Sequence, residues 1–340
     1  MNSTKKKREE YKDLTESKSY SQDWTEYNNA QTKEKLLFYK LLDELLNVIP
    51  ERTYTFGRPR KSLRDMIFCC MIKTYCNTSA RRIISDLELA KRAGHIQEVP
   101  HFNTVLNYFD DSGMRTILHY LIRVSAIPVK LVESQFAIDS TGFGTQRFDR
   151  WLDLKHRLKS PLGKYKKAHV SCGVKTNIIT SVEITKGNAA DITQFEDLLK
   201  DTAKHFDVEE ISADKAYSSR ANMDLANKIG AMPYIPFKAN AVGNARGSPT
   251  WSKMFKEFSE KYVEWAEHYH KRSNVESCFA MIKRKFGDSC RCKSDRSQNN
   301  EILCKILAHN IVVLIHEMFE LKIEIDFLAA SKEFPAQKVI

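Results

Sequence analysis

The chain has 340 residues, which is the length of about two domains. Its 54 lysines and arginines exceed its 43 aspartates and glutamates by 11, and this basic balance favours a polyanionic partner, nucleic acid before a membrane surface. With only 12 glycines and 9 prolines, the composition excludes collagen-like and linker-dominated chains and favours helices. Neither a complete G-x-G-x-x-G nor a G-x-x-x-x-G-K-[ST] pattern occurs, which argues against a Rossmann or Walker nucleotide site.

No segment of the sequence predicts secretion or membrane insertion. Residues 1–10 are basic and polar and lack the apolar stretch of a secretory signal. The most apolar segment, Ile306–Ile315, is interrupted by His309 and Asn310. The eight cysteines form no C-x-x-C pair, so buried reduced thiols are expected rather than a zinc site. We therefore expect a cytoplasmic protein with no membrane partner.

The first third of the chain has helical periodicity after a polar beginning. Residues 1–34 lack apolar periodicity and are expected to form a mobile polar tail. The helices expected after it cover Leu36–Ile49, 63–75, 79–93 and a short segment from Asn103. Two of them, joined by a turn at Gly94, resemble a helix-turn-helix, although most such pairs are ordinary helical hairpins.

From about residue 135 the pattern changes to that of short strands. The strands expected are Gln135–Asp139, Ala168–Lys175, Ile178–Thr185, Glu210–Asp214 and Pro233–Phe237, with a hairpin turn at Thr176-Asn177. The helices expected are one capped by Asp191 and reaching about His205, one over Arg220–Ile229 that ends at Gly230, and a long one over Glu264–Phe286. Residues 238–260 contain glycines and a proline and are interpreted as an insertion. This order predicts an α/β fold, a mixed sheet with helices on its faces.

Two acidic residues stand where predicted strands end. Asp139 follows Ile138 and Asp214 follows Ala213, each before a polar turn. In open sheets, ligands gather at strand ends. Aspartate at a strand exit is also a common turn residue, so this pair alone does not define a site.

Four side chains of the expected long helix lie on one face of it. Tyr269, Arg272, Glu276 and Lys283 are separated by three, four and seven residues, and at about 100° per residue they form one narrow stripe. A solvated face with an Arg272–Glu276 ion pair has this pattern. A site that holds phosphates beside a metal-binding carboxylate has it too.

The same four residues match the Y-(2)-R-(3)-E-(6)-K pattern of bacterial and archaeal insertion-sequence DDE transposases. The segments around Asp139 (AIDSTG) and Asp214 (ADKAYSS) resemble the first and second acidic motifs of that family. Basic segments near both ends of the match are similar to the family's terminal patterns. The resemblance covers about residues 55–320, apart from the insertion.

The resemblance implies a ribonuclease-H-like fold, a mixed sheet with flanking helices preceded by an all-helical DNA-binding domain. The boundaries expected are 1–34 for the polar tail, 35–134 for the helical region, 135–295 for the catalytic domain with its insertion at about 238–260, and 296–340 for a C-terminal helix and tail. The resemblance also implies that Asp139, Asp214 and Glu276 are catalytic and bind two Mg²⁺ or Mn²⁺ ions, which prefer carboxylate oxygens.

Further residues are implied to contact DNA. In the family, the tyrosine and the two cations of the stripe contact terminal phosphates, and this role is carried to Tyr269, Arg272 and Lys283. Residues 147–167 carry a charge of +6 and residues 271–296 a charge of +5, either as solubilising surface or to neutralise a DNA backbone. The basic residues outside the stripe that we expect to bind DNA are Arg58, Arg60, Lys164, Lys166 and Lys167. Trp151 either stacks on an unpaired base or packs in the core.

The predicted function is a metal-dependent DNA transposase that cleaves transposon ends and transfers the 3′-OH strand into target DNA. Its partners would be double-stranded DNA, as terminal inverted repeats and target, and a second copy of the chain in a homodimeric synaptic complex of a prokaryote. The alternatives are a metal-dependent nuclease of the same fold and a domesticated, non-catalytic DNA-binding protein. A nucleophile pair of Ser140 and His169 is not favoured, because nothing in the sequence orients a third member.

Overall fold

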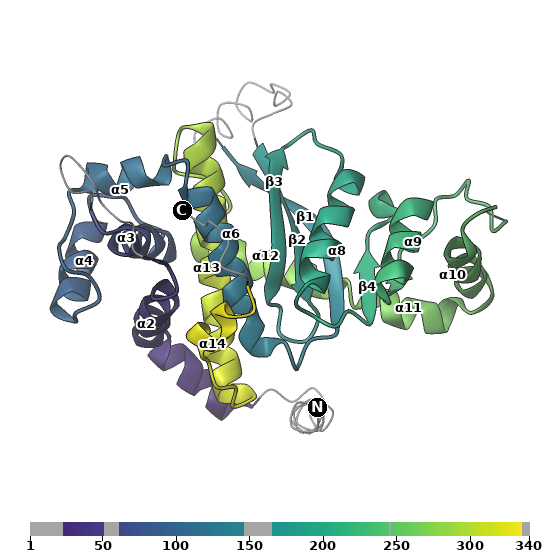
Figure 1. Cartoon of the computed structure of the whole chain (residues 1–340), viewed down its shortest axis with the longest axis horizontal. Helices are drawn as coiled ribbons and strands as arrows, with labels where there is room; N and C mark the ends of the chain where they lie inside the picture. Colours follow the sequence, from purple (N-terminus) through teal and green to yellow (C-terminus); the bar gives the residue numbers. More distant parts are fainter. Residues whose placement is uncertain (1–22, 51–60, 146–164, 245, 335–340) are drawn as a thin grey trace. The chain divides into compact units, whose positions relative to one another are not determined.

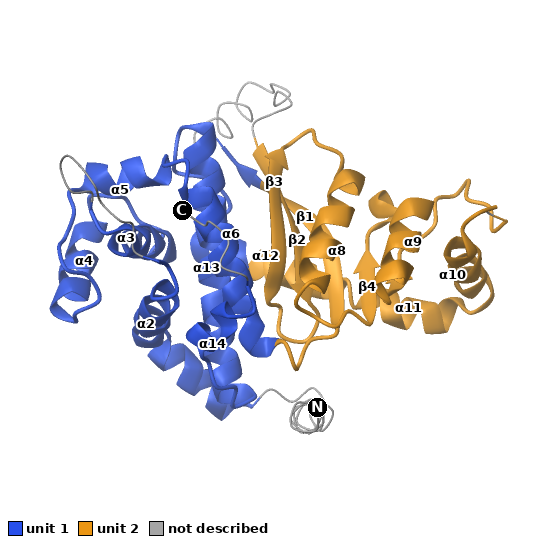
Figure 2. Cartoon of the chain, in the orientation of Figure 1, with its two compact units in different colours: residues 1–129, 143–160, 282–340 blue, residues 130–142, 161–281 orange. Residues whose placement is uncertain are grey.

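The computed structural model describes residues 23–50, 61–145, 165–244 and 246–334 (Figure 1). The chain divides into two compact units, which Figure 2 shows in different colours. Unit 1 contains residues 1–129, 143–160 and 282–340, and unit 2 contains residues 130–142 and 161–281. Strand β1 (Gln135–Gly144) and helix α12 (Ser273–Phe286) each begin in unit 2 and end in unit 1.

Unit 1 is built from helices. They are α2 (Trp24–Leu46), α3 (Leu63–Tyr75), α4 (Ile83–Arg92), α5 (Phe102–Phe109), α6 (Met114–Ala126), the 3₁₀ helix η1 (Ile127–Val129), α13 (Asp295–Glu320) and α14 (Phe327–Ser331). Helix α3 is almost wholly buried, and both α4 and α5 pack against it. The predicted helical region before the sheet is confirmed.

Helix α13 forms the centre of unit 1. It packs against α2, α3 and α6, so the C-terminal segment predicted as a separate part over 296–340 belongs to the same unit as the N-terminal helices. Among the described residues it is the helix long and apolar enough to cross a membrane, and 72% of its most apolar stretch is buried inside the structure. A core helix passes the same test of length and composition, so this is weak evidence for a membrane span.

The predicted polar tail over 1–34 is wrong from Trp24 onward, where α2 begins. The Asp23 carboxylate caps the helix by accepting two backbone N–H bonds of the first turn, each at 3.1 Å. Glu34 is buried and accepts a hydrogen bond from the Tyr75 hydroxyl of α3. A cap and a few buried polar contacts therefore extend the helix into a segment without apolar periodicity.

Unit 2 contains a five-stranded mixed sheet in the order β3-β2-β1-β4-β5, which confirms the predicted α/β architecture. Besides β1, its strands are β2 (Tyr165–Gly173), β3 (Ile179–Lys186), β4 (Glu210–Ala213) and β5 (Met232–Tyr234). Strands β2 and β3 form the predicted antiparallel hairpin, and Asn177 in its turn has the left-handed φ of 62°. Strand β4 runs parallel to both β1 and β5.

Helices flank this sheet (Figure 1). They are the 3₁₀ helices η2 (Asp191–Gln194) and η3 (Lys215–Tyr217), and α8 (Phe195–Ala203), α9 (Arg220–Ile229), α10 (Pro249–Glu260), α11 (Tyr262–His270) and the first part of α12. Helix α8 packs on β2 and β3, and α11 contacts β4 and β5. Helix α9 ends at Gly230 as predicted, with a φ of 100°. The predicted insertion contains α10, which packs on α9.

The eight cysteines are free thiols, and all except Cys76 are buried. The prediction of burial holds for the other seven.

Candidate active site

Asp139 and Asp214 occupy adjacent positions on neighbouring strands. The parallel pairing of β1 with β4 ends at Ile138 and Ala213, and each aspartate is the next residue of its strand or exit. Because paired strands lie about 4.8 Å apart, the sheet brings the two carboxylates close together. Strand β1 continues to Gly144, so Asp139 lies within the strand and not at its end as predicted.

Each aspartate is also held by the backbone amide that follows it. The amide of Ser140 donates to Asp139 Oδ1 at 2.8 Å, and that of Lys215 donates to Asp214 Oδ1 at 2.6 Å. Asp214 thereby caps η3. The Asp214 side chain therefore caps a local turn, and both carboxylates are held by the backbone at the positions predicted for a site.

Arg272 joins two of the three predicted acids. Its Nη1 donates to Asp139 Oδ2 at 2.6 Å, and its Nη2 donates to Glu276 Oε1 at 2.5 Å. The side chains of Arg272 and Asp139 are only 20% and 18% exposed, whereas that of Glu276 is 59% exposed. Since water screens an exposed pair, the contact with Asp139 is the stronger of the two.

Arg272 lies at a turn of the chain between α11 and α12. The single helix predicted over Glu264–Phe286 is wrong, since two residues separate the end of α11 at His270 from the start of α12 at Ser273. Glu210 at the start of β4 accepts from Lys271 Nζ at 2.9 Å and lies 3.0 Å from His268 Nδ1. These contacts fasten the end of α11 to the sheet.

The charges of the three acids act on one another. The pKa of Asp139 is raised, chiefly because burial disfavours the charged carboxylate. The charges of Asp214 and Glu276 raise it further, and the Ser140 amide and the Arg272 guanidinium oppose them. Three carboxylates that come from two strands and a helix therefore share one electrostatic environment.

Two members of the predicted stripe remain to be placed. The Tyr269 ring stacks on Trp265 at 5.2 Å between centroids, and the Arg272 guanidinium lies 6.0 Å from the Tyr269 centroid. Burial raises the pKa of Tyr269. Lys283 belongs to unit 1, where its Nζ lies 5.7 Å from the Phe143 ring centroid. Its contact with DNA stays a prediction.

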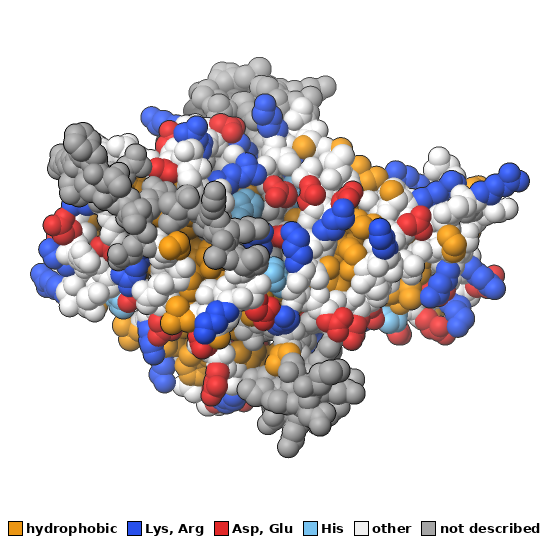
Figure 3. All heavy atoms as spheres, in the orientation of Figure 1, with side chains coloured by type: hydrophobic (Ala, Val, Ile, Leu, Met, Phe, Trp, Pro, Cys, Tyr) orange, Lys and Arg blue, Asp and Glu red, His pale blue; other side chains and the backbone are white. Residues whose placement is uncertain are grey.

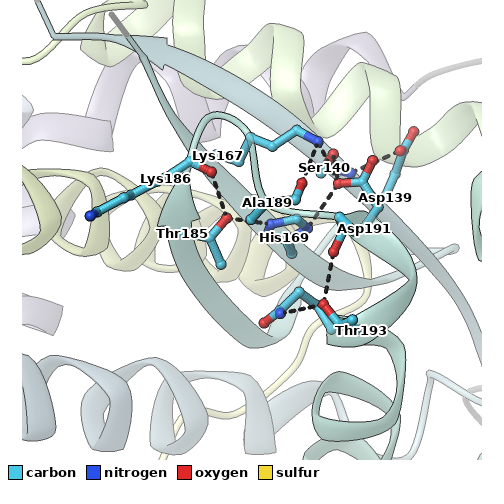
Figure 4. Close-up of polar contacts among 11 residues, drawn as sticks. Asp139, Ser140, Lys167, His169, Thr185, Lys186, Ala189, Asp191 and Thr193 are labelled. Carbon is cyan, nitrogen blue, oxygen red and sulfur yellow. Dashed lines mark hydrogen bonds and ion pairs between the residues drawn. The ribbon is translucent and has the colours of Figure 1, made fainter. Parts of the chain in front are cut away.

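A fourth carboxylate near Asp139 was not predicted as part of the site. Asp191 Oδ1 accepts from Lys167 Nζ at 2.6 Å and from Ser140 Oγ at 3.0 Å, and lies 3.3 Å from His169 Nδ1 (Figure 4). The prediction that Asp191 is a helix N-cap is wrong, because Asp191 is the first residue of η2 and makes no capping bond there. An aspartate before a helix is the usual signal for a cap, and nothing in the spacing shows the strands that it contacts.

The predicted basic surface receives little support from the described residues. Lys166 is 5% exposed, which does not fit a DNA-facing role, and Lys167 is paired with Asp191. Arg58, Arg60, Lys164 and Trp151 lie outside the described residues. On the face shown in Figure 3, the Lys and Arg side chains that are described are scattered among Asp and Glu.

The donor set of the acids suits a hard divalent cation, since carboxylate oxygens are the ligands that Mg²⁺ and Mn²⁺ prefer. Within the described ranges, however, no group of three His, Cys, Asp or Glu side chains is arranged to hold a metal ion. The Arg272 guanidinium contacts two of the acids, Asp139 and Glu276. The three acids therefore fit such an ion by their chemistry, and Arg272 is the cation that contacts two of them.

A family model described as the transposase DDE domain matches residues 130–311. The chain belongs to the transposase DDE domain family. The matched segment contains Asp139, Asp214 and Glu276, and its sheet and flanking helices agree with the predicted ribonuclease-H-like fold. A search of curated proteins found no match. The transposase is thus a nucleotidyl-transfer enzyme of a DNA-binding family that generally uses divalent metal ions.

Proposed function

We propose that this transposase cleaves DNA at the ends of its own element and joins the freed 3′-OH to a target phosphodiester. The observation that carries the proposal is the meeting of Asp139 and Asp214 on paired strands, with Glu276 linked to Asp139 through one guanidinium. Three acids of the matched family segment thereby share one environment, as the reaction requires.

Asp139, Asp214 and Glu276 would hold Mg²⁺ or Mn²⁺, two ions in each site. When bound, such ions stabilise the attacking and the leaving oxygen of an in-line displacement at phosphorus. The raised pKa of Asp139 reflects burial and repulsion, and a bound cation would favour its ionised form. The backbone amides of Ser140 and Lys215 would keep the Asp139 and Asp214 carboxylates oriented when a cation binds.

Arg272, Tyr269 and Lys283 would position the terminal phosphates. A guanidinium is always charged, and its fork of N–H groups matches phosphate oxygens. Stacking on Trp265 holds the Tyr269 ring beside Arg272. A phosphate that took Arg272 as its partner would free Asp139 and Glu276 for metal, so DNA binding and metal binding would favour each other.

The partners would be double-stranded DNA, as terminal inverted repeats and as target, and a second copy of the chain. Two ends must be brought together before joining, and a homodimeric synaptic complex meets this need. Arg58, Arg60 and Lys164 remain proposed DNA contacts. We place the protein in the prokaryotic cytoplasm, associated with DNA.

The proposal is tested by replacing Asp139, Asp214 and Glu276 with alanine, one at a time. The substrate is DNA that carries the inverted repeats flanking the gene. We expect each variant to lose strand cleavage and to bind the ends as the wild type does. Asp197→Ala is the matched control, because Asp197 is an exposed acid on α8. Cleavage retained by all three variants would refute the assignment.

Joining is measured separately with pre-nicked ends. A transposase joins them to target DNA when Mg²⁺ is present. Cleavage without joining, and without preference for the end sequence, would indicate a nuclease of the same fold. Binding without any metal-stimulated cleavage would indicate a non-catalytic DNA-binding protein.

A further inference from the structure

The carboxylate of Asp191, which is not one of the three acids, contacts polar side chains of two strands (Figure 4). Asp191 accepts hydrogen bonds from Lys167 of β2 at 2.6 Å and from Ser140 of β1 at 3.0 Å. His169 of β2 lies 3.3 Å away from the same oxygen. Asp191 itself precedes α8, so it ties the start of that segment to the middle of the sheet.

Ser140 connects this carboxylate to Asp139. Its hydroxyl donates to Asp191 Oδ1, and its backbone amide donates to Asp139 Oδ1 at 2.8 Å. One residue therefore bonds both carboxylates through separate donors. A change that freed the hydroxyl would loosen the backbone whose amide orients Asp139.

The cluster around Asp191 is largely shielded from water. The side chain of His169 is 0% exposed, and those of Lys167 and Asp191 are 20% and 22% exposed. The other ring nitrogen of His169 lies 2.8 Å from Thr185 Oγ1, and burial lowers the pKa of His169 to about 4. The histidine is therefore neutral at pH 7, and Lys167 supplies the charge that balances Asp191.

Tyr217 is influenced by the charges of Asp191, Asp139 and Asp214. Its side chain is buried. Burial raises the pKa of Tyr217, and the charges of Asp191 and Asp139 raise it further. The charges of both carboxylates therefore act on the Tyr217 phenol.

From this geometry we propose that Asp191 is a positioning residue, which orients Asp139 for metal binding through Ser140. The inference rests on the proposed function, because it concerns the same metal-binding carboxylates. When contacts that orient metal-binding side chains are lost, metal affinity or activity typically falls by about 10- to 100-fold.

The test uses three variants of the full chain. Asp191→Asn keeps the side-chain shape but replaces the charged acceptor of the Ser140 hydroxyl by a weaker neutral one, and we expect its Mn²⁺ affinity to fall about tenfold. Ser140→Ala removes the hydroxyl and should shift the affinity in the same direction. Ser140→Thr retains a hydroxyl and should restore it. The matched control is Asp197→Asn, at an exposed acid on α8.

Mn²⁺ binding is measured without DNA by electron paramagnetic resonance, with single-turnover cleavage, end binding and thermal unfolding in parallel. Weaker Mn²⁺ binding and slower cleavage in Asp191→Asn and Ser140→Ala, with unchanged end binding and recovery in Ser140→Thr, support the inference. A lower unfolding temperature with wild-type Mn²⁺ affinity would overturn it, because Asp191 would then serve the fold alone. Wild-type Mn²⁺ binding that survives Asp139→Ala would instead overturn the proposed function, and the inference with it.

Discussion

Replacing Arg272 with methionine removes the cation that joins Asp139 and Glu276. Methionine keeps the unbranched, flexible character of the arginine stem and carries no charge, so the two carboxylates lose their shared partner. If the guanidinium stands where a metal ion would bridge these acids, the variant should bind Mn²⁺ more tightly than the wild type in the absence of DNA.

The two contacts of Arg272 set the size of the effect. The largely buried contact with Asp139 is worth about 1.5–3 kcal/mol, as a hydrogen bond between charged groups. The contact with Glu276, whose side chain is 59% exposed, adds about 0.3–0.5 kcal/mol. Breaking both costs the wild type about 2 kcal/mol or more, which corresponds to about 30-fold in Mn²⁺ affinity.

Mn²⁺ affinity is measured by electron paramagnetic resonance or calorimetry for the wild type, Arg272→Met and Arg272→Lys. Lysine retains the charge without the fork, so an intermediate affinity is expected. Arg284→Met, at an exposed residue of α12, serves as the control. Despite tighter metal binding, Arg272→Met should cleave DNA more slowly because it loses the phosphate contact. An affinity equal to or below that of the wild type would refute the reasoning.

Three further predictions concern stability and reactivity. The pKa of His169 is about 4 in the folded chain and about 6.5 when unfolded, so its contribution to stability is complete above pH 6.5. That contribution, at most about 3 kcal/mol, is lost as the pH falls from 6.5 to 4, and His169→Gln should flatten this part of the pH profile in urea unfolding. Ser219→Ala removes the N-cap that accepts from the Asn222 amide at 3.1 Å, and should lower the free energy of unfolding by about 1 kcal/mol, with Ser219→Asp retaining it. Among the eight thiols Cys76 should react first with a thiol reagent, and more slowly than a free cysteine because its pKa is raised to about 11.

The parts of the fold that local signals determine could be predicted from the sequence. Short apolar segments between turn residues mark the strands, and Asn177 and Gly230 adopt left-handed conformations in the hairpin connection and at a helix end. The positions of Asp139 and Asp214 follow from the same strands, because residues next to a parallel pair must be neighbours. Motif and topology therefore agree on two of the three acids.

The parts that depend on contacts far apart in the sequence could not be predicted. Periodicity continues through the break before Ser273, and at the break Lys271 contacts Glu210, which is 61 residues away in sequence. The role of Asp191 depends on Ser140, which is 51 residues away, and the start of α2 depends partly on the burial of Glu34. In each case a polar contact between distant segments prevails over the local pattern.

The turn between α11 and α12 and the grouping of the three acids are connected through Arg272, which lies in that turn and contacts Asp139 and Glu276. Burial raises the pKa of Asp139, the charges of Asp214 and Glu276 raise it further, and the charge of Arg272, at the turn before α12, opposes them. A guanidinium that neutralises acids also matches phosphate, so the end of a DNA strand can draw it away while a metal ion takes its place. Metal and DNA should then bind with positive coupling. We expect end DNA to raise the Mn²⁺ affinity of the wild type about as much as Arg272→Met does, and to have little effect on that variant. If end DNA leaves the wild-type affinity unchanged, this exchange does not occur.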